Sequence, residues 1–286
     1  MSNLQAIRQQ RKLLDEIGKI MDSIKTIALI EMQQSRHTLD NQRQGISAMQ
    51  SAVSDFMTTF DAVHSATDQP FSNCPNVLIL IGSERGFCGD FNARVVDTLT
   101  QSIDTHVLEQ CQLIVVGYRL WNKLQHLSHA LTPLSGANVA AEIKTTLAAV
   151  VELLSTAPPA GGFESVTVVF HDDRHKQVRQ VKLLEGFMEN PRSQSTTTSY
   201  PPLTNLAPAE LLTELMGQYV YSHLNYLLTT SFVAENEQRV EHLRNALDQI
   251  DNQHLELAKK HNHLRQETIT EELEIILLNT LDKPEP

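Results

Sequence analysis

The sequence predicts a small α/β domain between two long terminal helices that pack antiparallel as a coiled coil. Both ends of the chain hold long stretches without proline, in which apolar residues recur at steps of three and four, the spacing of a coiled-coil seam. The middle alternates short apolar runs with helical patterns, which is typical of a mostly parallel sheet flanked by helices. We expect an N-terminal shaft helix over 1–68, a central Rossmann-like domain over 73–202 and a C-terminal shaft helix over 206–286.

The N-terminal helix is predicted from the stretch 14–63, which has no proline and only Gly18 and Gly45. Its apolar and small residues form one narrow stripe: Leu14, Ile17, Met21, Ile24, Ala28, Met32, Leu39, Ile46, Met49, Val53, Phe56, Phe60 and Val63. A stripe this narrow faces a partner helix rather than a broad core. At about 1.5 Å per residue the helix would be roughly 75 Å long, more than a single globular domain needs.

The C-terminal helix is predicted from the stretch 209–281, which has no proline and follows Pro208 at a suitable helix start. Its stripe contains seven apolar residues: Val233, Val240, Leu243, Leu247, Ile250, Leu257 and Leu264. His254 and His261 take stripe positions between the leucines, where they would form a pH-sensitive seam or, the interpretation we favour, set the helix register. We expect the two helices to bury their stripes against each other in an antiparallel pair. The segment between them must then begin and end at the same end of this pair.

The middle of the chain predicts the sheet. Three short, continuously apolar runs indicate strands buried on both faces: 77–81, 113–116 and 166–170. Helical patterns separate them around 90–102 and 136–154, and the polar, proline-bounded stretch 190–202 is expected to be a linker.

Composition and charge exclude several classes of protein. A net charge of −11 argues against nucleic acid and against an anionic lipid surface. Three cysteines at unrelated spacings, Cys74, Cys88 and Cys111, fit neither a disulfide framework nor a zinc site. The N-terminus carries charges every few residues, unlike a signal peptide, and no run approaches the roughly 20 apolar residues of a membrane span. We therefore expect a cytoplasmic chain.

The stretch 77–92, VLILIGSERGFCGDFN, begins as a nucleotide-binding loop does, with an apolar run followed by three glycines. The fingerprint G-x-G-x-x-G is absent, because Glu84 stands two residues before Gly86 and its charge would repel a phosphate. The next strand ends in Gly117 and Tyr118 rather than an acidic ribose ligand, and no P-loop motif occurs. We expect a tight strand-to-helix turn here, with no bound nucleotide and no cofactor.

Other catalytic patterns are weak. Cys88 at a helix start would be a reactive thiol if its pKa were lowered there, but with no histidine near it in sequence we favour a structural cysteine. The segment from His171 to His175 offers two histidines and two aspartates after a strand, and we favour a solvated charged turn over a metal site. The sequence thus predicts no catalytic and no metal-binding residues.

The glycine loop resembles that of the gamma subunit of F-type ATP synthases, the central rotor shaft. That family carries S-D-R-G-L-C-G-G-x-N at the end of its first sheet strand, and six positions match: Ser83, Arg85, Gly86, Cys88, Gly89 and Asn92. Glu84 and Phe87 are conservative replacements, whereas Asp90 replaces a glycine.

Both ends of the chain extend the resemblance. The family's closing pattern A-R-Q-x-x-I-T-x-E-L is matched at Arg265, Gln266, Ile269, Thr270, Glu272 and Leu273. Near the N-terminus Lys19, Ile20 and Ala28 match, but Glu31 stands where the family has a lysine. The order of end helix, sheet domain and end helix identifies a divergent and acidic bacterial-type member.

This resemblance implies a rotor without chemistry of its own. ATP would be made or hydrolysed on a surrounding ring of three alpha and three beta subunits. The α/β domain would bind the epsilon subunit and the membrane c-ring, on the cytoplasmic face of the cell inner membrane, as part of a peripheral complex. The family's function would be to couple rotation driven by ion flow to ATP synthesis or hydrolysis.

The resemblance also implies interface residues. Four would meet catch loops of the beta subunits: Arg265, Gln266, Thr270 and Glu272. Four would face the lower lobe of a beta subunit: Ile24, Lys25, Glu84 and Arg85. An apolar tip would be buried in a sleeve of the surrounding subunits: Ile275, Ile276, Leu277 and Leu278.

Two other classes stay open from the sequence. One is an enzyme that binds a small cofactor in the sheet domain, and the other is a coiled-coil adaptor unrelated to rotation. Within the rotor interpretation, the sequence leaves open whether H⁺ or Na⁺ is moved and whether the complex is the main synthase or a second, alternative ATPase.

Overall fold

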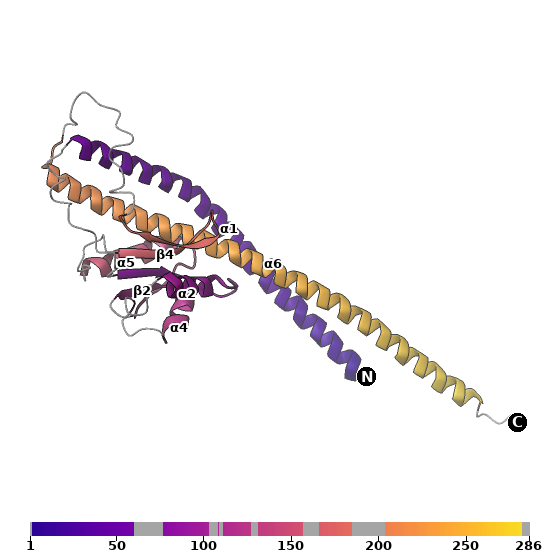
Figure 1. The fold of residues 1–286 in the computed structure, drawn as a ribbon. Helices are drawn as coiled ribbons and strands as arrows, with labels where there is room; N and C mark the ends of the chain where they lie inside the picture. Colours follow the sequence, from indigo (N-terminus) through magenta and orange to yellow (C-terminus); the bar gives the residue numbers. More distant parts are fainter. Residues whose placement is uncertain are drawn as a thin grey trace. The chain divides into compact units, whose positions relative to one another are not determined.

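A computed structural model of the chain describes residues 2–59, 77–102, 108, 111–126, 131–156, 166–184 and 204–281. It confirms the predicted fold class, a mostly parallel α/β sheet with a long helix at each end (Figure 1). The long helices are α1 (Ser2–Thr59) and α6 (Pro208–Leu281). The chain divides into two compact units, Met1–Ile27 with Val240–Pro286 and Ala28–Arg239, so each unit contains a part of both helices.

The sheet lies in the larger unit and has the strand order β3-β2-β1-β4-β5. Its strands are β1 (Val77–Ile81), β2 (Gln112–Val116), β3 (Leu131–Leu134), β4 (Val166–Asp172) and β5 (Gln177–Lys182). The first four are parallel, and β5 pairs antiparallel with β4. The sequence predicted β1, β2 and β4 but missed both edge strands. Pro133 obscures β3, and β5 is a polar, largely exposed strand, QVRQVK, without the continuous apolar run of a central strand.

Among the residues that the structure describes, four shorter helical segments accompany the sheet: α2 (Phe91–Ser102), α4 (Tyr118–Leu124), the 3₁₀ turn η2 (Ala140–Glu142) and α5 (Ile143–Thr156). The helix expected over 90–102 corresponds to α2. The helix expected from residue 136 begins later, as η2 at Ala140 and α5 at Ile143, and the backbone N–H of Gly136 donates to Glu84 instead. The short α4 was not expected, and the proposed linker 190–202 lies outside the described residues.

Side chains of the buried strands alternate between two apolar cores. On one face Ile79, Ile114 and Val168 pack against α5 and the long helices. On the other face Leu78, Leu80, Leu113 and Val115 pack against α2 and α4 (Figure 1). The result is a three-layer arrangement in which the sheet is covered on both sides, as parallel strands require.

In the smaller unit α1 and α6 pack antiparallel along the predicted stripes. Arg8 Nε donates to His261 Nε2 at 3.2 Å, and Gly18 lies against Ile250. His261 is thus half-buried on the α6 stripe, as expected. On α1 the prediction that Ile17 belongs to the stripe was wrong. Ile17 is exposed, and the seam passes through Gly18 instead because the chain takes a step of four after Leu14.

The glycine turn after β1 depends on close packing. A Cβ atom on Gly82 would lie 2.3 Å from Leu120 Cβ, which no side chain could tolerate. Gly89 adopts a φ of 56° and Phe87 a φ of 64°, so the turn uses the left-handed region twice. The expected strand-to-helix turn is therefore observed. It requires a residue without a side chain at Gly82 and a positive φ at Phe87 and Gly89.

Candidate functional site: the glycine loop and its attachment to helix α6

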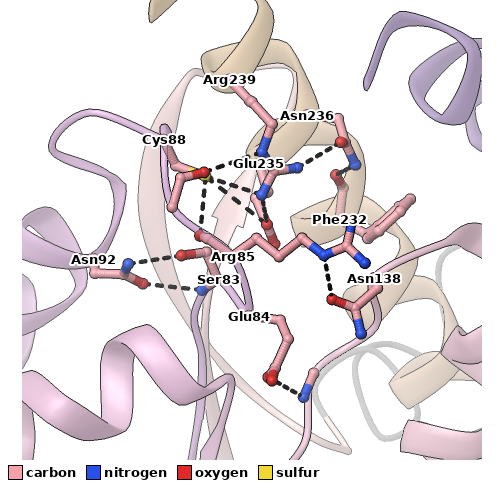
Figure 2. Close-up of polar contacts among 12 residues, drawn as sticks. Ser83, Glu84, Arg85, Cys88, Asn92, Asn138, Phe232, Glu235, Asn236 and Arg239 are labelled. Atoms are coloured by element: carbon pink, nitrogen blue, oxygen red, sulfur yellow. Dashed lines mark hydrogen bonds and ion pairs between the residues drawn. The ribbon is translucent and has the colours of Figure 1, made fainter. Parts of the chain in front are cut away.

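The Glu84 carboxylate binds backbone N–H groups at the carboxyl ends of neighbouring strands. Its Oε2 accepts hydrogen bonds from the backbone N–H of Tyr118 at 3.0 Å and of Gly136 at 2.8 Å. These N–H groups follow β2 and β3, so one carboxylate joins the ends of three neighbouring strands (Figure 2). Glu84, whose charge argues against nucleotide binding, therefore holds the loop in place through hydrogen bonds.

The loop is also held to helix α2 by its serine and asparagine. The backbone N–H of Ser83 donates to Asn92 Oδ1 at 2.9 Å, and Asn92 Nδ2 donates to Ser83 Oγ at 2.7 Å. Beside them Arg85 Nε donates to Asn138 Oδ1 at 2.7 Å (Figure 2). Three of the residues that match the family motif therefore have internal contacts that fix the turn.

A buried cluster of Cys88, Glu235, Asn236 and Arg239 attaches the loop to α6. The Arg239 guanidinium donates to Cys88 Sγ at 3.1 Å, to the Gly86 carbonyl at 3.2 Å and to Asn236 Oδ1 at 2.7 Å. It also forms an ion pair with Glu235 Oε1 (Figure 2). Because Glu235 and Arg239 are four residues apart on one helix, their side chains reach the loop together.

Burial controls the electrostatics of this cluster. It raises the pKa of the Cys88 thiol to about 12, and the nearby Glu235 carboxylate adds to this. Burial also raises the pKa of Glu235 to about 7, although the Arg239 charge opposes the rise. Burial alone would lower the pKa of Arg239, but Glu235 and Cys88 hold it above its ordinary value. A thiol with so high a pKa is not a nucleophile at neutral pH, which fits a structural cysteine.

A second set of contacts joins the α/β domain to the long helices. Glu31 Oε2 accepts the backbone N–H of Ala140 at 2.7 Å, at the start of η2. Glu31, which departs from the family's lysine, is thus engaged within this chain. Asp173 pairs with Arg43 at 3.3 Å in the turn between β4 and β5, and Lys176 in the same turn pairs with Glu237 at 3.3 Å.

The turn after β4 is more buried than the sequence suggested. The prediction of a solvated charged turn was wrong for His171 and Asp172, which are almost fully buried. His171 stacks on Phe91 with ring centroids 3.7 Å apart, and its Nε2 bonds to the Phe91 carbonyl at 2.8 Å. Asp172 accepts from His175 and Arg179. Within the described ranges no group of three or more potential ligands could hold a metal ion.

His171 is expected to make the larger unit sensitive to acid. Burial lowers the pKa of His171 to about 4 from 6.5. Between pH 6.5 and pH 4 the His171 ring is protonated in the unfolded chain but not in the folded chain. The free energy of unfolding therefore falls as the pH falls. The loss should reach about 3 kcal/mol by pH 4. Urea denaturation of the chain against pH measures it.

The matched variant His171→Gln retains a donor for the Phe91 carbonyl but does not titrate, so its curve should lose this slope. His175→Gln, at an exposed ring, should keep it. An unchanged acid slope in His171→Gln would contradict the assignment.

The structure places the sequence-predicted interface residues in different environments. Ile24 and Lys25 are half-buried on α1, and Lys25 pairs with Asp22 at 2.7 Å. The Glu84 carboxylate is engaged as described above, whereas Arg85 is exposed. Four residues of α6 are exposed: Arg265, Gln266, Thr270 and Glu272.

The apolar tip of α6 is exposed in the described part of the chain. The exposed fractions are 58% for Ile275, 57% for Ile276 and 60% for Leu277. Leu278 belongs to α6, but its side chain lies outside the described residues. In the same helix, Leu273 and Ile269 are exposed as well. The smaller unit therefore presents large apolar side chains near the end of α6.

Sequence reasoning missed Glu235 and Arg239, although a signal was present. The run 227–233, LLTTSFV, is apolar or small at every position, which indicates a helix buried on all sides. Charged residues four apart directly after such a run must pair with each other or with a neighbouring element. The predicted stripe included only Val233 from this run, so the burial of the rest of the run was not predicted.

A family model described as ATP synthase matches residues 3–277 of the chain. Curated relatives include the ATP synthase gamma chain of Rickettsia prowazekii, 24% identical over 286 residues, and that of Rickettsia typhi, 25% identical over 288 residues. In both cases 96% of this chain and 96% of the relative are covered.

Solved structures show the same fold at low sequence identity. A chain from the Euglena gracilis mitochondrial ATP synthase, in a cryo-EM structure of OSCP/F1/c-ring, is 16% identical with a TM-score of 0.62, covering 98% of this chain and 94% of that one. A chain from the central stalk/c-ring of the Tetrahymena thermophila enzyme is 17% identical with a TM-score of 0.58, covering 79% and 99%.

The family model, matched over nearly the whole chain, and the fold shared with solved ATP synthase chains define a non-catalytic, stalk-type subunit. The chain belongs to the ATP synthase gamma-chain family, and its role is that of the central-stalk rotor. No helix in the ranges given above is long and apolar enough to cross a membrane.

Proposed function

We propose that the chain couples ion-driven rotation to ATP synthesis or hydrolysis by turning within a ring of three alpha and three beta subunits. The observation that carries this proposal is the family match over residues 3–277, together with helices long enough to form a shaft. The α/β domain would bind the epsilon subunit and the c-ring. The complex would be peripheral, on the cytoplasmic face of the inner membrane.

Torque would pass between the α/β domain and the long helices through the larger unit. The buried cluster joins the glycine loop to α6, Glu31 joins α1 to η2, and Asp173 and Lys176 join the β4–β5 turn to both helices. Contacts at several separated points resist rotation of one part against the other better than one contact would. We therefore divide the chain functionally into shaft helices over 1–68 and 206–286 and a coupling domain over 73–202.

Partner contacts would come from the exposed residues of the predicted interface. Arg265 and Glu272 offer exposed charges, each able to form charge-assisted hydrogen bonds of about 1.5–3 kcal/mol. Arg85 offers a guanidinium that Asn138 holds in place. Glu84 would contribute by fixing the loop that presents Arg85, since its carboxylate already accepts two backbone hydrogen bonds.

The two alternative classes predict different results. A cofactor-binding enzyme needs an open anion site at the strand ends, where Glu84 Oε2 instead occupies the N–H groups of Tyr118 and Gly136. Isothermal titration of the isolated chain with ATP, ADP and NAD should give no micromolar binding. An adaptor unrelated to rotation would bind neither alpha nor beta subunits.

Co-expression with the alpha and beta subunits of the same genome tests the proposal. We expect a complex of three alpha, three beta and one copy of this chain that hydrolyses ATP. A fluorescent bead on the α/β domain should rotate when ATP is supplied. Failure to assemble with any alpha and beta pair of that genome would overturn the proposal.

A further inference from the structure

A small cavity lies between α6 and the sheet in the larger unit. Its volume is about 20 Å³, which is enough for one water molecule. Apolar side chains form most of its wall: Ile81, Val116, Ile143, Leu228 and Phe232. Thr146 contributes a hydroxyl that already donates to the Ser135 carbonyl at 3.2 Å, and two further polar residues, Ser231 and Glu235, line the cavity. The cavity thus combines the size of a water with groups that could bind one.

The two polar residues have unused hydrogen-bonding capacity. Ser231 is 1% exposed, and among the described residues its Oγ has no hydrogen-bond partner. The contacts of the Glu235 carboxylate within the same part of the chain, with Arg239 and Cys88, all fall on Oε1. A buried hydroxyl such as that of Ser231 costs free energy when it is unpaired. Empty cavities in proteins are usually apolar throughout, unlike this one.

We propose that one ordered water occupies this cavity and hydrogen-bonds both Ser231 Oγ and Glu235 Oε2. The water donates to the carboxylate and uses its remaining capacity on the serine hydroxyl. It thereby favours the ionised form of Glu235, the form that pairs with Arg239. Three charged or titratable groups face this carboxylate or act on it through space, and the water adds a donor to them: Arg239, the Cys88 thiol and Glu84.

The water makes Ser231 a positioning residue for the glycine loop. Ser231 hydrogen-bonds the water, and the water stabilises the ionised carboxylate of Glu235. This carboxylate orients the Arg239 guanidinium through their ion pair. That guanidinium in turn holds the Gly86 carbonyl and Cys88 Sγ. These hydrogen bonds and the ion pair all lie inside the larger unit, so the water site can be tested without any partner subunit.

Ser231→Ala tests the proposal, with Thr230→Val as its matched control. Thr230 is its neighbour on α6, is fully buried, and likewise has a hydroxyl without a partner in the described ranges, but it does not line the cavity. The measured quantity is the proton affinity of the Glu235 carboxyl, followed by ¹³C NMR of the full chain against pH. We expect Ser231→Ala to raise that affinity about threefold to tenfold, because an ionised group loses part of a charge-assisted bond. Thr230→Val should leave it unchanged.

A crystal structure at a resolution that shows ordered waters provides the second measurement. We expect a density peak at about 2.7–3.1 Å from both Ser231 Oγ and Glu235 Oε2. An empty cavity in such a structure overturns the proposal. Equal proton affinities for Glu235 in the wild type and in Ser231→Ala overturn it as well, even if a peak is present.

Discussion

Replacing Arg239 with leucine is expected to lower the free energy of unfolding by about 3–5 kcal/mol, because Glu235 would be left buried without its charge partner. The lost hydrogen bonds to Cys88 Sγ and the Gly86 carbonyl would also free the glycine loop from α6. Urea denaturation of the isolated chain measures the loss. Hydrogen exchange should rise in the same variant for the loop residues 83–90 and also for the central strands, whose exchange follows the global free energy of unfolding.

Two further variants give this prediction its controls. Arg94→Leu removes an ion pair with Asp90 whose side chains are 47% and 53% exposed, so it should cost under about 1 kcal/mol. The double variant Glu235→Leu with Arg239→Leu removes both buried charges and should recover much of the stability.

The pH dependence of the stability loss in Arg239→Leu provides a third check. Burial raises the pKa of Glu235, so without Arg239 the folded chain gains stability as the pH falls and the carboxyl takes up a proton. The loss in Arg239→Leu should therefore be smaller at pH 5 than at pH 8. If Arg239→Leu is no less stable than Arg94→Leu, the buried cluster does not stabilise the domain.

Replacing the apolar tip of α6 with serines is expected to weaken assembly with the alpha and beta subunits at least a hundredfold. The variant carries Ile275→Ser, Ile276→Ser and Leu277→Ser. If the surrounding subunits bury these side chains as we propose, each contributes about 1.5–3 kcal/mol, and every 1.4 kcal/mol changes affinity tenfold. Titration of the chain into the separated alpha and beta subunits, read as ATPase activity and as the yield of complex, measures the effect.

The conservative variant Ile275→Val, Ile276→Val and Leu277→Met is the control, because it keeps apolar side chains at all three positions. It should assemble nearly as the wild type does. The melting of the isolated chain should be similar in both variants, since the three side chains are already more than half exposed. Unchanged assembly of the serine variant would contradict burial of the tip.

The long helices and the buried strands could be predicted because their patterns are local. The stripe on α6 follows from the spacing of Leu243, Leu247 and Ile250, and the half-buried His254 and His261 lie on it as expected. The strands β1 and β2 and the first five residues of β4 are mostly apolar, which is typical of a sheet covered on both faces. The edge strands were missed, since one face of an edge strand need not be apolar.

Some properties of the glycine loop could likewise be predicted from the sequence, whereas its contacts could be seen only in the structure. The sequence argued against a bound nucleotide from the charge of Glu84, and it favoured a structural role for Cys88, which fits the burial and raised pKa of this thiol. It could not show that Glu84 bonds to Tyr118 and Gly136, because those groups are brought to it by two other strands. Nor could it show that the partner of Cys88 is Arg239, which is far away in the chain.

By itself the sequence determined the fold class and the family resemblance, since both depend on residue spacing. Only the tertiary structure decided which charges are buried together. The contacts of Arg239 with Cys88 and of Glu31 with Ala140 join elements that are remote in sequence. The free energy of such contacts depends on desolvation and geometry, and neither exists until the helices and the sheet have packed.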